Sequence, residues 1–305
     1  MTQLEISTKI GCKNMCSYCP QKKILASYKS KEYIMSFNTF KKCINKVPNK
    51  IKIVFAGMAE PFLNKDCMKM IIYAHKQGFP IEIFTTGVGM TVKDVKELEK
   101  IPVKYFDFHL PDDSGSTQIK VDSALLKAIK AISESKIKNI HYQVFGKLHP
   151  EVKKVLNFDV EDLSRLLQNR AGNIEEGFGF KTKRIKGKII CLSAEKRFDN
   201  SVLLPNGDVF LCCMDYGLEH RLGNLLESSY ESLFQTDYFK KLQKALDDDS
   251  KDLLCRYCSY ARRTDSLKYK IRKNLDKLGV TNKVYGLTKY KPVKKAYIYI
   301  KDKIK

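Results

Sequence analysis

The chain contains the loop Cys12-Lys-Asn-Met-Cys16-Ser-Tyr-Cys19, which places three cysteines close together near the N-terminus. The loop follows Leu4–Ser7, whose alternating apolar residues predict a short first strand. It therefore lies at the carboxyl end of a strand, where α/β folds gather their functional residues. Structural iron–sulfur and zinc sites use four protein ligands, so three thiolates favour a [4Fe–4S] cluster with one open iron.

The residue chemistry of this loop also allows two other interpretations. A zinc ion can be held by the same thiolates together with a fourth ligand from elsewhere in the chain. The cysteines can also be inert thiols that lie together by chance. The chain has ten cysteines and Met1–Cys12 lacks the pattern of a secretory signal, which argues for metal or redox use rather than disulfides.

Beyond this loop, the first 190 residues alternate between strand and helix patterns. Compact β-rich runs predict strands at Ile51–Ala56, Ile81–Thr85, Tyr105–Leu110 and Ile140–Phe145. Apolar residues at helical spacing predict helices at Phe37–Val47, Cys67–Gln77, Val92–Lys100 and Ala124–Ser133. This alternation predicts a parallel sheet, either as a barrel or as a doubly wound sheet, and periodicity alone does not separate the two.

The composition changes after residue 181, and a second group of cysteines appears. Val202–Leu211 predicts a hairpin around an Asn-Gly turn, and Leu225–Leu246 is predicted to be mostly helical. Four soft ligands can close a tetrahedral iron–sulfur or zinc site here: Cys191, Cys212, Cys255 and Cys258.

With these motifs in view, the N-terminal loop resembles the signature of the radical S-adenosylmethionine (SAM) superfamily. In that family the open iron of a [4Fe–4S] cluster binds the methionyl part of SAM. The resemblance implies that Cys12, Cys16 and Cys19 ligate the cluster, and that Tyr18 lies near the adenine. It also implies a partial (β/α)6 TIM-type barrel, and it covers roughly residues 4–145.

Three more motifs follow in the family's order. Gly57-Met-Ala-Glu60-Pro resembles the Gly-Gly-Glu-Pro motif that holds the SAM amino group, although both central glycines are replaced. Thr85-Thr86-Gly87 resembles a Thr-Asn-Gly motif at the end of the third strand, which implies a cofactor contact by Thr86. His109 stands where relatives often have a serine that contacts the ribose, and a buried core histidine is the alternative.

The C-terminal cysteines resemble the SPASM/twitch extension of radical SAM enzymes. The similar segments are Pro205–Val209, Asp215, Leu222–Leu225, Ser232–Phe234 and the Cys255-Arg-Tyr-Cys258 pair. A full SPASM domain needs seven cysteines for two clusters, so the resemblance implies one auxiliary [4Fe–4S] cluster with four protein ligands. Such a cluster would accept an electron, tune a potential or act as a structural clasp.

Cys213 has three possible roles. It can replace Cys212 as a ligand, or it can donate a hydrogen atom to a substrate radical, as thiols do in epimerases of this superfamily. A third interpretation is a small buried hydrophobic residue.

The chain is strongly basic, with 56 lysines and arginines, 34 aspartates and glutamates, and a formal net charge of +22. Residues 263–305 carry half of it, +11, from twelve lysines and two arginines against three aspartates. Leu267, Ile271 and Leu275 have helical spacing, which predicts a basic helical tail. This tail either binds an anionic surface or polyanion, or is a solvated lysine-rich segment.

We therefore expect an α/β barrel over residues 1–185, a small α+β auxiliary-cluster domain over 186–262 and a basic tail over 263–305. No apolar run is long enough for a membrane span, and a cytoplasmic location is expected. The resemblance implies an electron donor of the flavodoxin or ferredoxin type.

The resemblance further implies that the chain reductively cleaves SAM to a 5′-deoxyadenosyl radical, which abstracts a substrate hydrogen. The predicted outcome is oxidation or epimerisation of a small molecule such as a sugar or aminocyclitol. A peptide-maturing enzyme that forms crosslinks or thioethers is one alternative. A non-enzymatic iron–sulfur or zinc binding module is the other.

Overall fold

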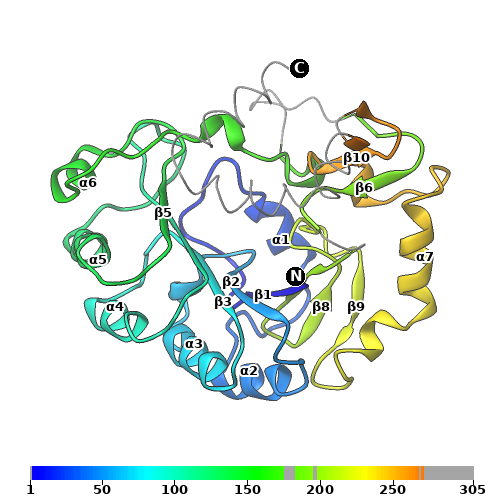
Figure 1. Cartoon of the computed structure of the whole chain (residues 1–305), viewed down its shortest axis with the longest axis horizontal. Helices are drawn as coiled ribbons and strands as arrows, with labels where there is room; N and C mark the ends of the chain where they lie inside the picture. Colours follow the sequence, from blue (N-terminus) through cyan, green and yellow to red (C-terminus); the bar gives the residue numbers. More distant parts are fainter. Residues whose placement is uncertain (1, 175–182, 195–197, 268, 271–305) are drawn as a thin grey trace.

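One eight-stranded sheet organises the molecule, and the computed structural model describes residues 2–174, 183–194, 198–267 and 269–270. The strand order is β5-β4-β3-β2-β1-β7-β8-β9 (Figure 1). Its first five strands in the chain are β1 (Gln3–Ser7), β2 (Lys52–Ala56), β3 (Ile81–Thr85), β4 (Tyr105–His109) and β5 (Ile140–Gln143). They pair in parallel, as the sequence predicts.

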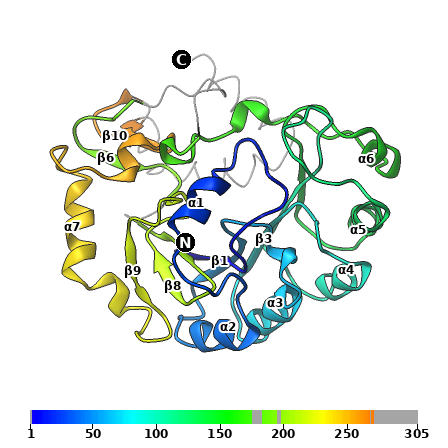
Figure 2. The ribbon, with the colours of Figure 1, turned by 180° about the vertical axis from the view of Figure 1, so that it is seen from behind.

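A row of helices covers the outer side of the curved sheet (Figure 1, Figure 2). These are α2 (Phe37–Ile44), α3 (Cys67–Lys76), α4 (Val92–Leu98), α5 (Ser123–Ser133) and α6 (Pro150–Val155). Several begin at a side chain that accepts a hydrogen bond from the first turn, namely Ser36, Thr91 and Asp122. Among the described residues, no helix has the length and apolar character needed to cross a membrane.

The helix α1 (Gln21–Ser27) directly follows the cysteine loop and lies apart from this row (Figure 1). The sequence analysis does not predict it, because only seven residues are helical. Its fully buried Ile24 belongs to an apolar cluster with Ile10 and Met58 from the first half of the chain and Val202 from the second. This cluster joins the two halves beside the loop.

The second half of the chain extends the same sheet. β7 (Asn200–Leu203) pairs in parallel with β1, and β8 (Asp208–Phe210) and β9 (Arg221–Asn224) follow in antiparallel pairing. The α/β partial barrel with a small C-terminal part is therefore confirmed. The sixth parallel strand is β7 from the second half, whereas Val144 beyond β5 makes a single parallel bridge to Asp162.

The rest of the C-terminal part is a two-stranded sheet and one helix. β6 (Ile189–Cys191) pairs in antiparallel fashion with β10 (Ala261–Arg263), and α7 spans Asp237–Ala245. The helix predicted over Leu225–Leu246 was too long at its start. Thr236 caps α7 by accepting a hydrogen bond from the Phe239 amide, so the helix begins at Asp237. Most of the predicted basic tail, from residue 271 onward, lies outside the described residues.

Candidate active site

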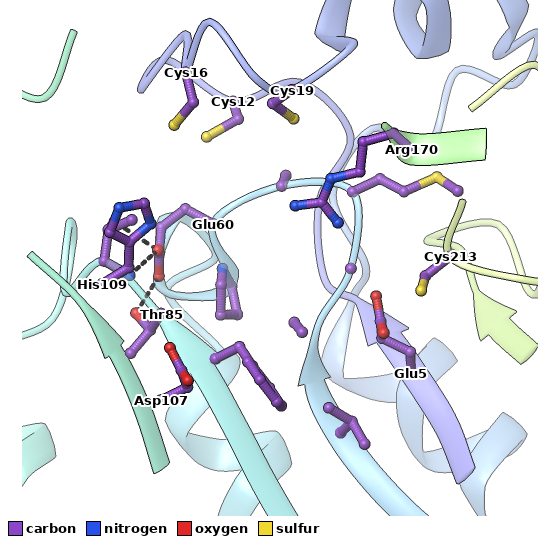
Figure 3. Close-up of a pocket in the computed structure, with 18 of the residues that line it drawn as sticks. Glu5, Cys12, Cys16, Cys19, Glu60, Thr85, Asp107, His109, Arg170 and Cys213 are labelled. Atoms are coloured by element: carbon purple, nitrogen blue, oxygen red, sulfur yellow. Dashed lines mark hydrogen bonds between the residues drawn. The ribbon is translucent and has the colours of Figure 1, made fainter. Parts of the chain in front are cut away.

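A cavity of about 380 Å³ opens at the carboxyl ends of the parallel strands. The loop after β1 covers one side of it with Cys12, Cys16 and Cys19 (Figure 3). The structure thus brings together every cofactor residue that the resemblance named, because the same cavity is lined by Tyr18, Gly57, Glu60, Thr86 and His109. It also places Cys213 on the wall near β1 (Figure 3).

Gln21, at the start of α1, holds the cysteine loop in place. Its side-chain oxygen accepts a hydrogen bond from the Cys12 amide at 3.0 Å, and its nitrogen lies 3.3 Å from Cys19 Sγ. The same nitrogen donates to the Met58 carbonyl at 2.5 Å. The sequence analysis missed Gln21, whose only signal is a polar residue in the first turn after the third cysteine.

The cysteine side chains form an all-sulfur donor set in a poorly solvated place. Burial raises the pKa of the Cys12 thiol and raises the pKa of Cys16 to about 12. Thiolates in such surroundings need a nearby positive charge, which iron supplies. The donor set therefore suits an iron–sulfur cluster, although no group of three or more His, Cys, Asp or Glu in the described chain has the spacing for a single metal ion.

Glu60 is buried where β2 turns into the short 3-10 helix Pro61–Leu63. Its Oε1 accepts hydrogen bonds from the Thr85 hydroxyl at 2.6 Å and the Phe62 amide at 3.1 Å. Its Oε2 accepts from both the amide and the hydroxyl of Thr86 at 2.7 Å. Burial raises the pKa of Glu60, and these donors oppose that shift. The carboxylate is thereby fixed against the end of β3.

Gly57 allows this turn to approach β1. Its φ is +90°, and a Cβ atom here would lie 2.8 Å from the Ser7 Cα. Both the backbone conformation and the available space thus require glycine at this position of the motif. Met58 and Ala59 replace the central glycines, and Met58 is fully buried in the apolar cluster with Ile24.

An aromatic group forms the wall next to β4 and β5. The Tyr18 hydroxyl lies 3.1 Å from His109 Nε2, and the two rings stack with centroids 5.8 Å apart. Phe145 meets His109 edge-on at 4.6 Å. Burial lowers the pKa of His109 to about 4, so its ring is neutral near pH 7. This arrangement offers flat, uncharged surfaces to a bound ligand.

Asp107 on β4 anchors the deeper wall of the cavity. Its Oδ2 accepts hydrogen bonds from the Tyr105 hydroxyl at 3.1 Å and from His141 Nδ1 at 3.2 Å. Gln143 Nε2 donates to the other oxygen. The sequence analysis predicts these strands but not their inward polar residues, because a strand pattern alone does not show which face borders a cavity.

The adjacent cysteines after β8 have different surroundings. Cys213 lines the cavity, and its single S–H group can donate a hydrogen bond either to Glu5 on β1 or to Cys212. The hydrogen bond to Cys212 and burial raise the pKa of Cys213 far above the usual thiol value. Cys212 interacts electrostatically with Cys255 and Cys258, whereas Cys213 interacts with Cys258 alone of these two. Of these two cysteines, Cys213 belongs to the lining of the cavity, whereas Cys212 does not and is close to both cysteines of the C-terminal pair.

Cys191 joins these C-terminal cysteines through the small sheet. Its strand pairs Cys191 with Ala261, three residues after Cys258. Burial is the main reason why the pKa of Cys191 rises to about 11, and Cys258 adds to that shift. Each of the thiols of Cys191, Cys212, Cys255 and Cys258 therefore lies within electrostatic range of at least two of the others. Their chemistry, four soft sulfur donors, suits an iron–sulfur cluster.

Comparison with known families identifies both halves of the chain. Residues 6–150 match the radical SAM superfamily, and residues 191–259 match the SPASM iron-sulfur cluster-binding domain. No match was found among curated proteins.

Several solved structures share the fold, among them the following three. BtrN in complex with AdoMet and 2-DOIA aligns with a TM-score of 0.57 and 19% identity, over 85% of this chain and 93% of BtrN. Streptococcus suis SuiB bound to precursor peptide SuiA aligns with a TM-score of 0.54 and 13% identity, over 85% of this chain and 70% of SuiB. AnSMEcpe with bound AdoMet aligns with a TM-score of 0.51 and 15% identity, over 90% of this chain and 98% of anSMEcpe.

Proposed function

Because this chain belongs to the radical SAM superfamily and carries a C-terminal SPASM domain, we propose that it removes a hydrogen atom from a small polar substrate and inverts the configuration of that carbon. Its cofactors are a [4Fe–4S] cluster, SAM and an auxiliary iron–sulfur cluster. When bound, the first cluster and SAM supply a one-electron cleavage whose product takes the substrate hydrogen.

We assign the cofactor contacts to the residues around the upper cavity. Cys12, Cys16 and Cys19 would hold the first cluster, and Gln21 would keep their loop in shape. Contacts to SAM would come from Tyr18, Gly57, Glu60, Thr86 and His109. The neutral rings of Tyr18 and His109 suit an adenosine, whereas the Glu60 carboxylate suits an ammonium group.

The auxiliary cluster would be held by the C-terminal thiols, Cys191, Cys212, Cys255 and Cys258. Under this assignment Cys212, rather than Cys213, is the ligand after β8. The observation that carries the proposed reaction is that Cys213 lines the cavity on the β1 side, whereas Glu60 and His109 line the opposite side (Figure 3).

A thiol in this position can return a hydrogen atom to the face of the substrate opposite the one that lost it. The substrate radical takes the hydrogen from the Cys213 S–H bond, and a thiyl radical remains on the sulfur. One electron and one proton restore the thiol. An auxiliary cluster held by the C-terminal thiols would supply such an electron when reduced by the added reductant, and solvent would supply the proton. The substrate then differs from the starting material only in its configuration.

The test uses anaerobically reconstituted protein, a strong reductant, SAM and a panel of sugars and aminocyclitols in D2O. Because a thiol exchanges its hydrogen with solvent, the inverted product should carry one deuterium at the inverted carbon. Cys213→Ala should form 5′-deoxyadenosine without inverted product, and Cys43→Ala, at a buried position on α2, is the matched control. Inverted product from Cys213→Ala at the parent rate would rule out the proposal.

Oxidation is the second candidate, because the hydrogen bond between Cys213 and Cys212 connects the cavity with the auxiliary thiols. A substrate radical that passed its electron to the auxiliary cluster and lost a proton would leave as a ketone. A product two mass units lighter, without solvent deuterium, would identify this reaction. If a peptide alone stimulated SAM cleavage, the substrate would instead be a peptide.

A further inference from the structure

The inner face of the sheet below the cysteine loop is polar. Barrels of this architecture normally fill their interior with bulky branched side chains. Here the strands instead turn these residues toward the cavity: Gln3, Glu5, Glu82, Asp107 and Gln143. Even Phe84 between them is 38% exposed. The lower cavity is therefore a polar chamber with several carboxylates.

All but one of the carboxylates around this cavity have strong partners. Four donors satisfy Glu60, and three donors satisfy Asp107. Glu82 forms an ion pair with Lys52 at 3.1 Å. These three carboxylates therefore do not require a hydrogen bond or a positive charge from a ligand in the lower chamber.

Glu5 is the exception. It is 8% exposed, and its hydrogen-bond partners are the Cys213 thiol and the Gly57 amide. Among the residues that the structure describes, no Lys, Arg or His nitrogen lies within 4.0 Å of its carboxylate. Burial raises the pKa of Glu5, and the charge of Arg170, which lies beyond ion-pair distance, offsets only part of this rise. A ligand that brings a positive charge would offset the remainder.

Arg170 lies on the same side of the cavity and, like Glu5, lacks an ion-pair partner among the described residues (Figure 3). Its guanidinium has five N–H donors, and its Nη1 lies 3.9 Å from Met214 Sδ. No carboxylate in the described chain lies within ion-pair distance of it. Arg170 therefore has donors to offer to acceptor atoms of a ligand.

Arg170 lies in a segment with an energetically unfavourable backbone conformation. Arg170 and Ala171 have φ values of +48° and +56°, which non-glycine residues rarely adopt. The segment is tied to the C-terminal cysteine region, because the Asn169 side chain donates to the Tyr257 carbonyl at 2.6 Å and accepts from the Ser259 amide at 2.8 Å. Strain that the surrounding structure enforces is typical of functional positions.

From this juxtaposition, and resting on the proposed function, we infer that the chamber binds a small polyol that carries a protonated amine. Glu5 binds the ammonium group, and Arg170 donates to hydroxyl oxygens next to it. A substrate carboxylate in place of the amine would meet repulsion from Glu5, which Arg170 alone would have to offset. The inference thus names a cationic amine, rather than a neutral sugar or an anion, as the feature that is recognised.

The test measures equilibrium binding to the reconstituted, SAM-bound protein without reductant, so that no turnover occurs. The probes are matched pairs that differ only in an amine or a hydroxyl: scyllo-inosamine with scyllo-inositol, and glucosamine with glucose. We expect at least one amine to bind about 10- to 100-fold more tightly than its hydroxyl partner, the effect of a buried charged hydrogen bond. Glu5→Gln should abolish this preference.

Two further variants separate recognition from general damage. Glu82→Gln removes another carboxylate of the same sheet whose charge Lys52 already balances, and it should keep the preference for the amine. Arg170→Gln should weaken the binding of both members of each pair to a similar degree, because Arg170 contacts the hydroxyl groups that the two members share. Loss of amine preference in Glu82→Gln, or its retention in Glu5→Gln, would overturn the assignment.

The outcomes also distinguish this inference from the proposed function. If no amine binds more tightly than its hydroxyl partner, or if no probe binds, the inference is wrong. The proposed function would still stand if a neutral substrate gave inverted product with solvent deuterium. If an amine binds as expected but no substrate hydrogen enters 5′-deoxyadenosine after reduction, the proposed function fails while the recognition stands.

Discussion

Among the single residues of the site, Glu60 is the most constrained. An ionised carboxylate accepts all four of its hydrogen bonds, and both Thr86 donors approach the same oxygen. An amide offers one acceptor oxygen, and its NH2 group would face donors. We therefore expect Glu60→Gln to weaken SAM binding by about 10- to 100-fold.

Calorimetric titration of SAM into the anaerobic, cluster-loaded protein measures this effect. Glu97→Gln is the matched control, because Glu97 lies on the outer helix α4 and pairs with Lys100. Unchanged affinity in Glu60→Gln would show that this carboxylate has no part in the SAM site.

His109 provides a prediction about pH. Its pKa of about 4 lies below the value of about 6.5 in an unfolded chain, so the unfolded state binds the proton first. The stability that depends on this difference is complete above pH 6.5 and decreases as the pH falls toward 4. His109→Phe keeps a ring beside Tyr18 but has no imidazole to protonate. Between pH 7 and pH 5, we expect its free energy of unfolding to fall by about 1–2 kcal/mol less than that of the parent.

Denaturant unfolding at the two pH values measures this difference, with His75→Phe on α3 as the control. Parallel stability losses in the parent and in His109→Phe would mean that the folded protein does not depress the pKa of His109.

At this scale the sequence predicted the residues that belong to motifs and missed those that depend on packing. Tyr18 and Glu60 stand at fixed places in motifs, and both line the cavity. Glu5 and Arg170 carry no such signal. Glu5 is one polar residue in a strand, and Arg170 follows no motif, so only the folded chain shows that they lie at one cavity.

Among the structural elements, the short segment between Cys255 and Cys258 is held by a buried arginine. Arg256 is fully buried, and its guanidinium donates to the carbonyl groups of Lys251, Ile185, Gly187, Ala245 and Asp248 at 2.6 to 3.1 Å. It therefore connects the cysteine pair with the end of α7 and with the strand leading to Cys191. The full set of acceptors explains how a charge can be buried here without a carboxylate.

Replacing Arg256 by Met should leave several buried carbonyl groups without donors, at a cost of about 3–5 kcal/mol. We expect the C-terminal cluster to be lost first, so that iron per chain falls from about eight to about four. Iron analysis and melting of the reconstituted protein measure both effects, and Arg263→Met at an exposed position is the control. Full iron content in Arg256→Met would exclude this role.

The elements themselves were predictable where their patterns are long or repeated. The alternation of buried strands and amphipathic helices gave β1 to β5 and α2 to α5 with small errors at their ends. α1 was missed because only Ile24 and Gln21 are buried in its seven residues. α7 was predicted too long because the apolar residues before it form a 3-10 turn, Ser232–Phe234, rather than a continuous helix.

For the whole molecule, the important feature is that one sheet runs through both predicted parts. Our proposed boundary at residue 185 separates β1 from β7, although these strands are paired along Gln3–Ile6. The sequence could not show this pairing, because parallel strands far apart in the chain leave no local pattern. The proposed domains are therefore sequence units that share a sheet and an apolar cluster.

This sharing predicts that neither part is stable by itself. A chain ending at residue 185 would expose the edge of β1 and the apolar surface of Ile10, Ile24 and Met58. We expect this fragment to aggregate or to melt without cooperativity, whereas mixing it with residues 186–305 during refolding should restore a cooperative transition. Circular dichroism melting and size-exclusion chromatography test both points. If residues 1–185 alone melted cooperatively as a monomer, the pairing of β1 with β7 would contribute little to folding, and the auxiliary part would be an independent module rather than one wall of the same barrel.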